Sequence, residues 1–458
     1  MAKLRTMQVC SECGTSHPKW VGQCVGCGEW NSLVEEVVAS PLPVAAGPPG
    51  QRTSTPMQIG AVDTAVGRPR PTGIGELDRV LGGGLVPGSV TLLGGEPGIG
   101  KSTLLLQLLA WWPGPTLYVS AEESAQQVRL RADRLRAVRP GLWLLAETSL
   151  PDIVTAIDEV QPELVVVDSI QTVEDPSLGS PPGGVVQVRG CAHRLVVEAK
   201  RRGLPVIMVG HVTKDGGLAG PRVLEHIVDT VLAFEGDRHH ALRMLRATKH
   251  RFGPTDELGL FEMVGTGLVG VPDPSTLFLA DRRTGVPGSV VVPTLEGQRP
   301  LVVEVQALTS KVSTQVPPRR TAQGIDSGRL ALLLAVLDKR ARIATGEHDV
   351  YASTVGGVRL TEPGLDLGIC LALVGAIHDL PVPADMVAFG EVGLGGEVRQ
   401  VAHASRRLAE AARLGFTRAL VPTNSPHSDA LRAIRVATVP EALAAAGLLG
   451  ESLAGARR

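Results

Sequence analysis

Residues Gly95–Ser102 read GEPGIGKS and match the pattern G-x4-G-K-[ST] in full. A β-branched run, Ser89–Leu93, precedes this stretch, and an apolar segment of helix length, Lys101–Trp111, follows it. Glycines allow the backbone N–H groups of such a loop to surround a phosphate chain, and the following helix N-terminus adds partial positive charge. The stretch therefore predicts a nucleotide-binding P-loop between a strand and a helix.

The P-loop, together with a later strand that ends in an aspartate, predicts sites for ATP and Mg²⁺. We expect Lys101 to reach the β- and γ-phosphates and Ser102 to bind Mg²⁺. A buried run, Leu164–Asp168, ends in an acid, which predicts that Asp168 holds Mg²⁺ directly or through water, although many strands end in aspartate for turn reasons. The residues expected to bind ATP are Gly94, Gly95, Glu96, Pro97, Gly98, Ile99, Gly100, Lys101, Ser102 and Thr103.

Two adjacent glutamates, Glu122 and Glu123, follow the predicted strand Thr116–Ser120. A glutamate at the carboxyl end of such a strand lies beside the phosphate site and can polarise the attacking water. The alternative is a helix cap in which Ser120 is the N-cap and Glu123 the third residue of the helix. We therefore assign Glu122 as the catalytic base and Glu123 to the cap.

Short apolar runs alternate with amphipathic segments of helix length from about residue 57 to residue 271. Strand, helix and strand at this spacing predict an α/β fold, a mainly parallel sheet with helices on both faces. The expected strands are Ser89–Leu93, Thr116–Ser120, Leu142–Leu145, Leu164–Asp168, Pro205–Val209 and Asp229–Phe234, and the expected helices are Lys101–Trp111, Ser124–Arg136, Pro151–Val160 and Val188–Arg202.

The N-terminal block, residues 1–36, contains two Cys-x2-Cys pairs separated by ten residues. Each pair forms a tight turn that points two thiolates at one place, so four thiolates predict a closed structural Zn²⁺ site. The alternatives are two disulfides or four free thiols. Residues 37–56, rich in Pro, Ala and Gly, are expected to be a linker. The expected zinc ligands are Cys10, Cys13, Cys24 and Cys27.

Composition limits the classes of protein that this chain can be. The chain has 458 residues, of which 43% are hydrophobic and 20% are charged, so it is globular, with two or three domains. The net charge of −1 predicts neither a nucleic-acid nor a membrane partner by itself. No apolar run approaches the ~18–20 residues of a membrane helix, so we expect a cytoplasmic protein.

Together these motifs resemble the bacterial RadA (Sms) family of DNA repair ATPases, which has a RecA-like ATPase core. The resemblance covers nearly the whole chain. It rests on the four-cysteine block and on GGEPGIGKST (94–103), SAEES (120–124), LVVVDSIQT (164–172), GHVTKDG (210–216), AGPRVLEHIVD (219–229) and LRATKHRFGPTDELGLFEM (245–263). The family has Lys-Asn-Arg-Phe-Gly where this chain has His250 in the second position.

The resemblance implies a hexameric ring that binds ATP at subunit interfaces and passes single-stranded DNA through its pore. It implies DNA-stimulated ATP hydrolysis and a helicase-type motor that drives branch migration of recombination intermediates. Lys249 and Arg251 are expected to act on a neighbour's γ-phosphate, as an arginine finger does. Without the resemblance, the pattern favours a solvated basic face for Arg243, Arg246, Lys249 and Arg251.

Two glycine-rich stretches, residues 174–184 and 213–222, follow strands near the phosphate site. We expect these loops to bind DNA phosphates through backbone N–H groups and through Arg189, Lys214 and Arg222, the alternative being mobile surface loops. Single-stranded and branched DNA are the expected partners, with recombinase or replication proteins as further candidates.

The C-terminal block, residues 272–458, resembles the α/β proteolytic domain of Lon proteases. Gly364 stands at the position of the family's serine nucleophile, and Arg407 stands at that of its lysine. Glycine offers no nucleophile and arginine cannot act as a base, so we expect a scaffold without protease activity. Its candidate DNA-contacting residues, which fit a solvated helix face as well, are Arg399, Arg406, Arg407 and Arg413.

The leading interpretation is a DNA-dependent ATPase motor. Its main rival is a RecA-fold ATPase switch or autokinase that acts on a protein partner. The single ATPase core and the cysteine block favour the first interpretation, because autokinase chains of that type usually duplicate the core.

Overall fold

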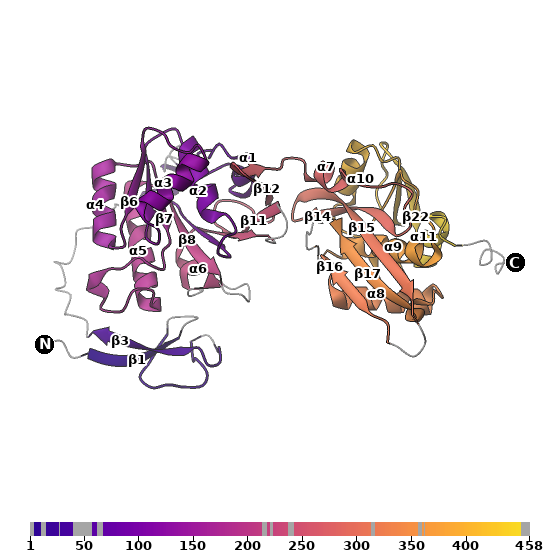
Figure 1. The fold of residues 1–458 in the computed structure, drawn as a ribbon, viewed down its shortest axis with the longest axis horizontal. Helices are drawn as coiled ribbons and strands as arrows, with labels where there is room; N and C mark the ends of the chain where they lie inside the picture. Colours follow the sequence, from indigo (N-terminus) through magenta and orange to yellow (C-terminus); the bar gives the residue numbers. More distant parts are fainter. Residues whose placement is uncertain are drawn as a thin grey trace. The chain divides into compact units, whose positions relative to one another are not determined.

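The computed structural model describes residues 4–10, 15–26, 28–39, 57–61, 67–212, 218–219, 223–236, 242–312, 317–355, 360 and 362–449. The predicted site residues Cys13, Cys27, Lys214 and Arg222 lie outside this part of the chain. The chain divides into two compact units, Met1–Val271 and Pro272–Arg458, which are described separately (Figure 1). None of the described helices is both long and apolar enough to cross a bilayer.

A small antiparallel sheet forms the N-terminal part of the first unit. Its strands are β1 (Leu4–Cys10), β2 (Ser16–His17) and β3 (Leu33–Ala39), in the order β2-β1-β3. The end of β1 pairs with the start of β3, so that Cys10 lies opposite Leu33. These two residues and Cys24 form a small buried cluster. Strand β3 continues to Ala39, into the stretch that was expected to be linker.

A ten-stranded sheet forms the centre of the first unit, in the order β13-β12-β11-β10-β4-β8-β7-β5-β6, with β9 paired to β8. The strands from β10 to β6 run parallel, and β11, β12 and β13 continue the sheet antiparallel. Their bounds are β4 (Val90–Gly95), β5 (Thr116–Ser120), β6 (Leu142–Ala146), β7 (Leu164–Asp168), β8 (Val206–Val212), β9 (Leu218–Ala219), β10 (Thr230–Glu235), β11 (Leu242–His250), β12 (Leu258–Val264) and β13 (Gly267–Gly270).

Helices cover both faces of this sheet, which confirms the predicted α/β architecture (Figure 1). Successive residues of a strand point to opposite faces, so Val166 packs in one core cluster and its neighbours Val165 and Val167 pack in the other. The first cluster includes α2 and α3, and the second includes α4 and α5. The helices are α1 (Gly75–Val80), α2 (Lys101–Trp111), α3 (Ala125–Arg134), α4 (Leu150–Val160), α5 (Val185–Arg202) and α6 (Val223–Ile227), with 3-10 turns η1 (Ile59–Ala61) and η2 (Pro176–Leu178).

The second unit contains a seven-stranded mixed sheet in the order β16-β17-β15-β14-β18-β21-β22, and a separate pair, β19 and β20. Its strands are β14 (Ser289–Glu296), β15 (Arg299–Lys311), β16 (Arg320–Gln323), β17 (His348–Thr354), β18 (Met386–Ala388), β19 (Glu391–Val392), β20 (Val398–Arg399), β21 (Arg418–Pro422) and β22 (Arg432–Val436). Its helices are α7 (Pro274–Leu279), α8 (Ser327–Arg340), α9 (Asp366–His378), α10 (Ala404–Arg413) and α11 (Val439–Ala445), with 3-10 turns η3 (Thr345–Glu347) and η5 (Pro363–Leu365).

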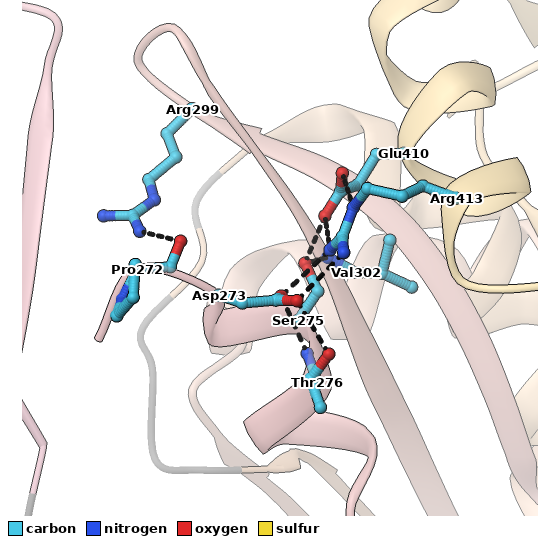
Figure 2. A network of polar contacts seen from close by, with 8 residues as sticks. All are labelled: Pro272, Asp273, Ser275, Thr276, Arg299, Val302, Glu410 and Arg413. Atoms are coloured by element: carbon cyan, nitrogen blue, oxygen red, sulfur yellow. Dashed lines mark hydrogen bonds and ion pairs between the residues drawn. The ribbon is translucent and has the colours of Figure 1, made fainter.

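A polar network holds α7, the first helix of the second unit, against α10 (Figure 2). Asp273 caps α7 by accepting from the N–H and the hydroxyl of Thr276. Both terminal nitrogens of Arg413 donate to the same carboxylate at 2.9 Å. Arg413 also pairs with Glu410, which accepts from the Ser275 hydroxyl at 2.8 Å. The guanidinium of Arg413 is therefore engaged within its own unit, which weakens its candidacy as a DNA contact.

Candidate nucleotide site

The predicted phosphate loop connects β4 to α2, as the sequence pattern requires. Gly98 and Gly100 have φ values of +80° and +120°, a region that favours glycine. A Cβ atom at Gly100 would lie 2.7 Å from the terminal carbon of Met263, the end of a flexible side chain that can move. The positive φ values are therefore the constraint that explains glycine at both positions.

Lys101, the first residue of α2, is buried within the curve of this loop. Its Nζ donates to the backbone carbonyls of Gly95 at 2.7 Å and Glu96 at 3.0 Å. Burial lowers the pKa of Lys101, and the charges of Asp168 and Glu122 oppose that shift. The two carboxylates therefore lie close enough to the ammonium to help keep it charged.

Asp168, at the end of β7, is held by donors from two other elements. Ser102 Oγ, from α2, and the Tyr118 hydroxyl, from β5, both donate to Asp168 Oδ2 at 2.6 Å. Burial, and then the Asp168 charge, raise the pKa of Tyr118, so its hydroxyl stays protonated and remains a donor. Hydroxyl and carboxylate oxygens are the ligands that Mg²⁺ prefers, so Ser102 and Asp168 fit the predicted metal site.

Sequence reasoning missed Tyr118, because it stands inside an apolar strand pattern where an aromatic ring is normally a packing residue. The only signal was its polar tip, two residues before the strand end. Tyr118 lies opposite Val166 in the neighbouring strand β7, and Ser120 lies opposite Asp168. The pairing of β5 with β7 therefore determines that the Tyr118 hydroxyl reaches Asp168.

Glu122 and Glu123 have different partners. The Ser169 hydroxyl donates to Glu122 in a short hydrogen bond, and both terminal nitrogens of Arg131 donate to Glu123. The expected cap of α3 by Ser120 and Glu123 is wrong. Ser124 is the N-cap and forms a capping box with Gln127, while Ser120 instead closes the turn before the helix.

These groups line a single cavity of about 430 Å³ at the carboxyl ends of β4, β5 and β7. Parallel strands bring their carboxyl ends to one edge of the sheet, which is where ligands bind in folds of this kind. The lining residues are Pro97, Gly98, Gly100, Lys101, Ser102, Thr103, Ser120, Glu122, Glu123, Arg131, Arg134 and Asp168. The structure thus brings together the predicted phosphate-binding, magnesium-binding and catalytic residues of this edge.

Comparison with known proteins agrees with this geometry. The model of an AAA domain matches residues 61–217, and the model of a rubredoxin metal binding domain matches residues 9–35. The DNA repair protein RadA of Mycobacterium tuberculosis is 49% identical over 97% of this chain and 93% of its own length. The RadA proteins of Bacillus subtilis and Pseudomonas aeruginosa are 47% and 48% identical, over 97% and 96% of this chain and 99% and 97% of their own lengths.

This chain belongs to the RadA family of DNA repair proteins. The ATPase domain and the metal-binding ribbon expected from the sequence are therefore both present. A solved KaiC-like protein from Pyrococcus horikoshii is 20% identical to this chain, covers 45% of it and 99% of its own chain, and has a TM-score of 0.37. That similarity is too low to support an argument.

The cations of the RadA-type motif, Lys249 and Arg251, lie at the opposite end of the strands, level with the start of β4. His250 pairs with Thr230, which pairs with Thr91 of β4, whereas the phosphate loop begins after Gly95. Four residues of strand separate these two levels, which corresponds to about 13 Å. The structure therefore does not bring Lys249 and Arg251 to the phosphate loop of their own chain.

Both cations are engaged locally at this end. Lys249 Nζ donates to the carbonyls of Glu225 at 2.6 Å and Val228 at 2.8 Å, and Arg251 Nη1 donates to Asp229 at 3.2 Å. Burial, and then the neighbouring Arg251, lower the pKa of Lys249. The side chain of Arg251 remains half exposed, so it can reach beyond its own chain.

His250, the residue that departs from the family pattern, has a structural role in this chain. Its Nε2 lies 3.2 Å from the carbonyl of Leu81, to which it donates, so Nδ1 is left to accept from the Thr230 hydroxyl at 2.9 Å. Burial lowers the pKa of His250, which favours this neutral form. An asparagine also offers one donor and one acceptor, which explains how histidine replaces it.

Arg243 also departs from the solvated basic face considered above. It is 6% exposed, and its Nε donates to the carbonyl of Ile99 in the phosphate loop at 3.1 Å. Arg243 thus supports the loop from β11. No signal in the sequence indicates this role of Arg243, because its partner Ile99 is 144 residues away.

Residues 174–184, predicted as a DNA-contacting loop, are held by the buried side chain of Gln187. Its Oε1 accepts from the Asp175 N–H at 3.0 Å, and its Nε2 donates to the Ser180 carbonyl at 2.8 Å. Arg189 lies on the following helix, α5, with its side chain exposed. The loop thus has a defined attachment beside an exposed cation.

The described part of the cysteine ribbon is compatible with a metal. Cys10 and Cys24 are buried together, and the Gly26 N–H lies 3.3 Å from Cys24 Sγ, to which it donates. Such N–H···S contacts stabilise thiolates, which are the form that binds zinc. Because Cys13 and Cys27 lie outside the described residues, the full ligand set remains a prediction.

At the Lon-like position of the second unit, Arg407 is 1% exposed, so the prediction that it lines a DNA-contacting surface is wrong. It donates to both oxygens of Glu362 and to the carbonyl of Pro293. A Cβ atom at Gly364 would lie 2.6 Å from Glu362 Oε1, so a serine does not fit there without movement. An ion pair between a buried arginine and a partly exposed glutamate thus lies beside the position that the resemblance assigns to a nucleophile.

Proposed function

We propose that this RadA-family protein is a DNA-stimulated ATPase that acts as a helicase-type motor and drives branch migration of recombination intermediates. The observation that carries the proposal is the cavity at the carboxyl ends of β4, β5 and β7, where the P-loop residues Lys101 and Ser102 lie together with the carboxylates of Glu122 and Asp168. Every group that phosphoryl transfer needs from one subunit lies at this edge.

Four polar side chains of the cavity have roles in this proposal. Lys101 leaves its two backbone carbonyls to bind the β- and γ-phosphates of ATP. Ser102 and Asp168 hold Mg²⁺, which neutralises charge on the phosphates. Glu122 orients and deprotonates the attacking water, and the Ser169 hydroxyl positions that carboxylate.

Lys249 and Arg251 complete the site of a neighbouring subunit in a hexameric ring. Their position at the opposite end of the sheet from their own phosphate loop supports action on a neighbour. In the described part of the chain Arg251 pairs with the carboxylate of Asp229 at 3.2 Å, and a negatively charged γ-phosphate can compete for it. Hydrolysis then depends on assembly.

Single-stranded DNA binds to the two glycine-rich stretches that follow β7 and β8 in the chain, through Arg189, Lys214 and Arg222. The exposure of Arg189 beside a held loop supports this assignment. Contacts of this kind go to phosphates, so binding should weaken as salt is added. Branched DNA and recombinase or replication proteins are the further partners that we propose.

The two flanking domains contribute binding surfaces and no second chemistry. Cys10, Cys13, Cys24 and Cys27 hold a structural Zn²⁺, and the second unit is a scaffold without protease activity. The Glu362–Arg407 ion pair supports the latter point, because it lies where a serine–lysine pair would be needed.

The test is ATP hydrolysis by the full chain with and without single-stranded DNA, with Lys101→Ala as the blank. We expect a several-fold stimulation that falls as salt rises. A rate that ignores DNA would contradict the motor and would favour a switch that acts on a protein partner.

The role of Arg251 in a neighbour's site has its own test. Arg251→Ala should bind ATP normally and hydrolyse it slowly. Mixing it with Lys101→Ala should restore part of the activity, because some interfaces then combine an intact P-loop with an intact Arg251. If Arg251→Ala alone hydrolyses ATP at the normal rate, the assignment is wrong.

A further inference from the structure

The nucleotide cavity contains a cation that neither the P-loop nor the RadA-type motif includes. Arg131, on α3, lines the cavity beside Lys101, Glu122 and Asp168. Its two terminal nitrogens donate to the two oxygens of Glu123, at 2.6 Å and 2.7 Å. The side chain of Arg131 is 24% exposed and that of Glu123 is 36% exposed, so solvent and ligands can reach this pair.

The charges on the cavity wall indicate what would disturb this ion pair. Among the residues that line the cavity, the cations Lys101, Arg131 and Arg134 balance the carboxylates Glu122, Glu123 and Asp168. ATP brings more negative charge than one Mg²⁺ neutralises, and its terminal phosphate is the part that ADP lacks. A further cation of the wall, in addition to Lys101, would therefore gain a favourable charge interaction with the terminal phosphate.

Arg131 is the cation that is placed for this. The hydrogen bonds that Arg131 donates to Glu123 raise the pKa of Arg131 most. The charge of Asp168 acts in the same direction, so the guanidinium also lies within the field of the proposed magnesium ligand. A guanidinium binds carboxylate and phosphate with the same two-pronged geometry. Exchange between Glu123 and a phosphate therefore requires a change of partner and no change of the helix.

We propose that Arg131 is a phosphate-binding residue supplied by the same chain as the P-loop. Arg131 breaks its ion pair with Glu123 to bind the terminal phosphate of ATP, and it pairs with Glu123 again when only ADP remains. This inference rests on the proposed ATP-binding function of the cavity. Because Glu123 is adjacent to Glu122, the exchange changes the hydrogen bonding of the segment that carries the proposed catalytic base when ATP is present.

The test compares binding of ADP and of a non-hydrolysable ATP analogue, each with Mg²⁺, by calorimetry on the full chain. Arg131→Gln should weaken analogue binding about tenfold, as expected for losing a charge-assisted hydrogen bond, and should change ADP binding by less than about twofold. The matched control is Arg129→Gln on the same helix, because Arg129 is 62% exposed and pairs with Asp133. It should leave both affinities unchanged.

Glu123→Gln separates this role from a structural one. Removing the competing carboxylate should preserve or strengthen analogue binding, the opposite of the effect of Arg131→Gln. If the ion pair only stabilises the start of α3, both substitutions should weaken both nucleotides alike, and the proposal is overturned.

Two further outcomes are distinguishable. If the wild-type chain binds neither nucleotide, the proposed function itself fails; if it binds both with a preference that Arg131→Gln does not change, only the present inference fails. Should Arg131→Gln not fold, Arg131→Lys keeps the charge, loses the two-pronged geometry and should show a smaller loss of the same preference.

Discussion

The substitution Tyr118→Phe removes one hydroxyl that holds the carboxylate proposed to bind Mg²⁺. Tyr118 is 2% exposed, and its hydroxyl lies 2.6 Å from the Asp168 oxygen that also accepts from Ser102. Ser102 would offer its oxygen to a bound Mg²⁺, whereas the Tyr118 hydroxyl would remain a donor to Asp168. Tyr118 is therefore the donor that orients Asp168 in both states.

The size of the effect follows from this geometry. A hydrogen bond to a charged group contributes about 1.5–3 kcal/mol. Phenylalanine retains the ring, so the cavity left behind is small. Asp168 keeps Ser102 as a donor and is 9% exposed, so water can replace part of the lost bond, and we expect a loss near 1.5 kcal/mol in the free energy of unfolding of the first unit.

A second consequence concerns the metal. A less ordered Asp168 should raise the Mg²⁺ concentration for half-maximal hydrolysis, up to about tenfold if the whole loss of about 1.5 kcal/mol is expressed in binding. Because burial and Asp168 raise the pKa of Tyr118, its hydroxyl is protonated throughout the range of about pH 6 to 9, and the effect should not depend on pH there.

The assays are urea unfolding and the Mg²⁺ dependence of ATP hydrolysis, with Tyr351→Phe as the matched control. Tyr351 is the only other tyrosine of the chain, lies in the second unit and is 38% exposed. If Tyr118→Phe and Tyr351→Phe differ by less than about 0.5 kcal/mol and show the same Mg²⁺ dependence, Tyr118 does not hold Asp168 in the manner argued.

Three other predictions follow from single residues. His250 has a lowered pKa, so its contribution to stability is present above about pH 6.5 and lost as pH falls further; His250→Asn should reduce that acid dependence of the thermal midpoint. The hydrogen bond with Arg413 lowers the pKa of Asp273 to about 2. The second unit should therefore lose stability as pH falls from 4 toward 2, by under about 1 kcal/mol because the pair is partly exposed. In an acid titration, Asp273→Asn should remove that loss. Stripping the metal with a chelator should unfold the sheet around Cys10 and Cys24 while nucleotide binding persists, as limited proteolysis and calorimetry can show.

The parts of the site that could be predicted are those whose residues are local in sequence. The P-loop is specified by glycines with positive φ between an apolar strand and a helix, and these features are contiguous from β4 to α2. The approach of Glu122 and Asp168 to the loop follows from one rule, because parallel strands end at a common edge. The fold class follows from continuous apolar runs, typical of strands buried on both faces.

The residues that could not be predicted act through partners far away in the chain. Arg243 supports Ile99, which is 144 residues away, and Gln187 looks like any helical glutamine until loop 174–184 is placed beside it. Arg407 reads as a surface cation, because arginine is almost never fully buried without a partner, and that partner, Glu362, is 45 residues away. The predicted helix cap is one turn too early, because Ser120 and Ser124 are each followed three residues later by Glu or Gln. The pairing of Glu123 with Arg131, which the sequence does not show, decides between them.

The separation of the two functional ends of the sheet has a consequence for assembly. The phosphate loop follows the end of β4, and Lys249 and Arg251 lie at the level of its start. If these cations serve a neighbour's nucleotide, as proposed, each contact joins one end of a sheet to the opposite end of another, so the interface is head-to-tail. Such an interface closes into a ring only if its rotation returns to the starting subunit, and otherwise it extends into a filament. A particle whose mass stays constant as protein concentration rises therefore indicates the ring, whereas a mass that keeps growing indicates the filament and would leave the proposed pore without a structural basis.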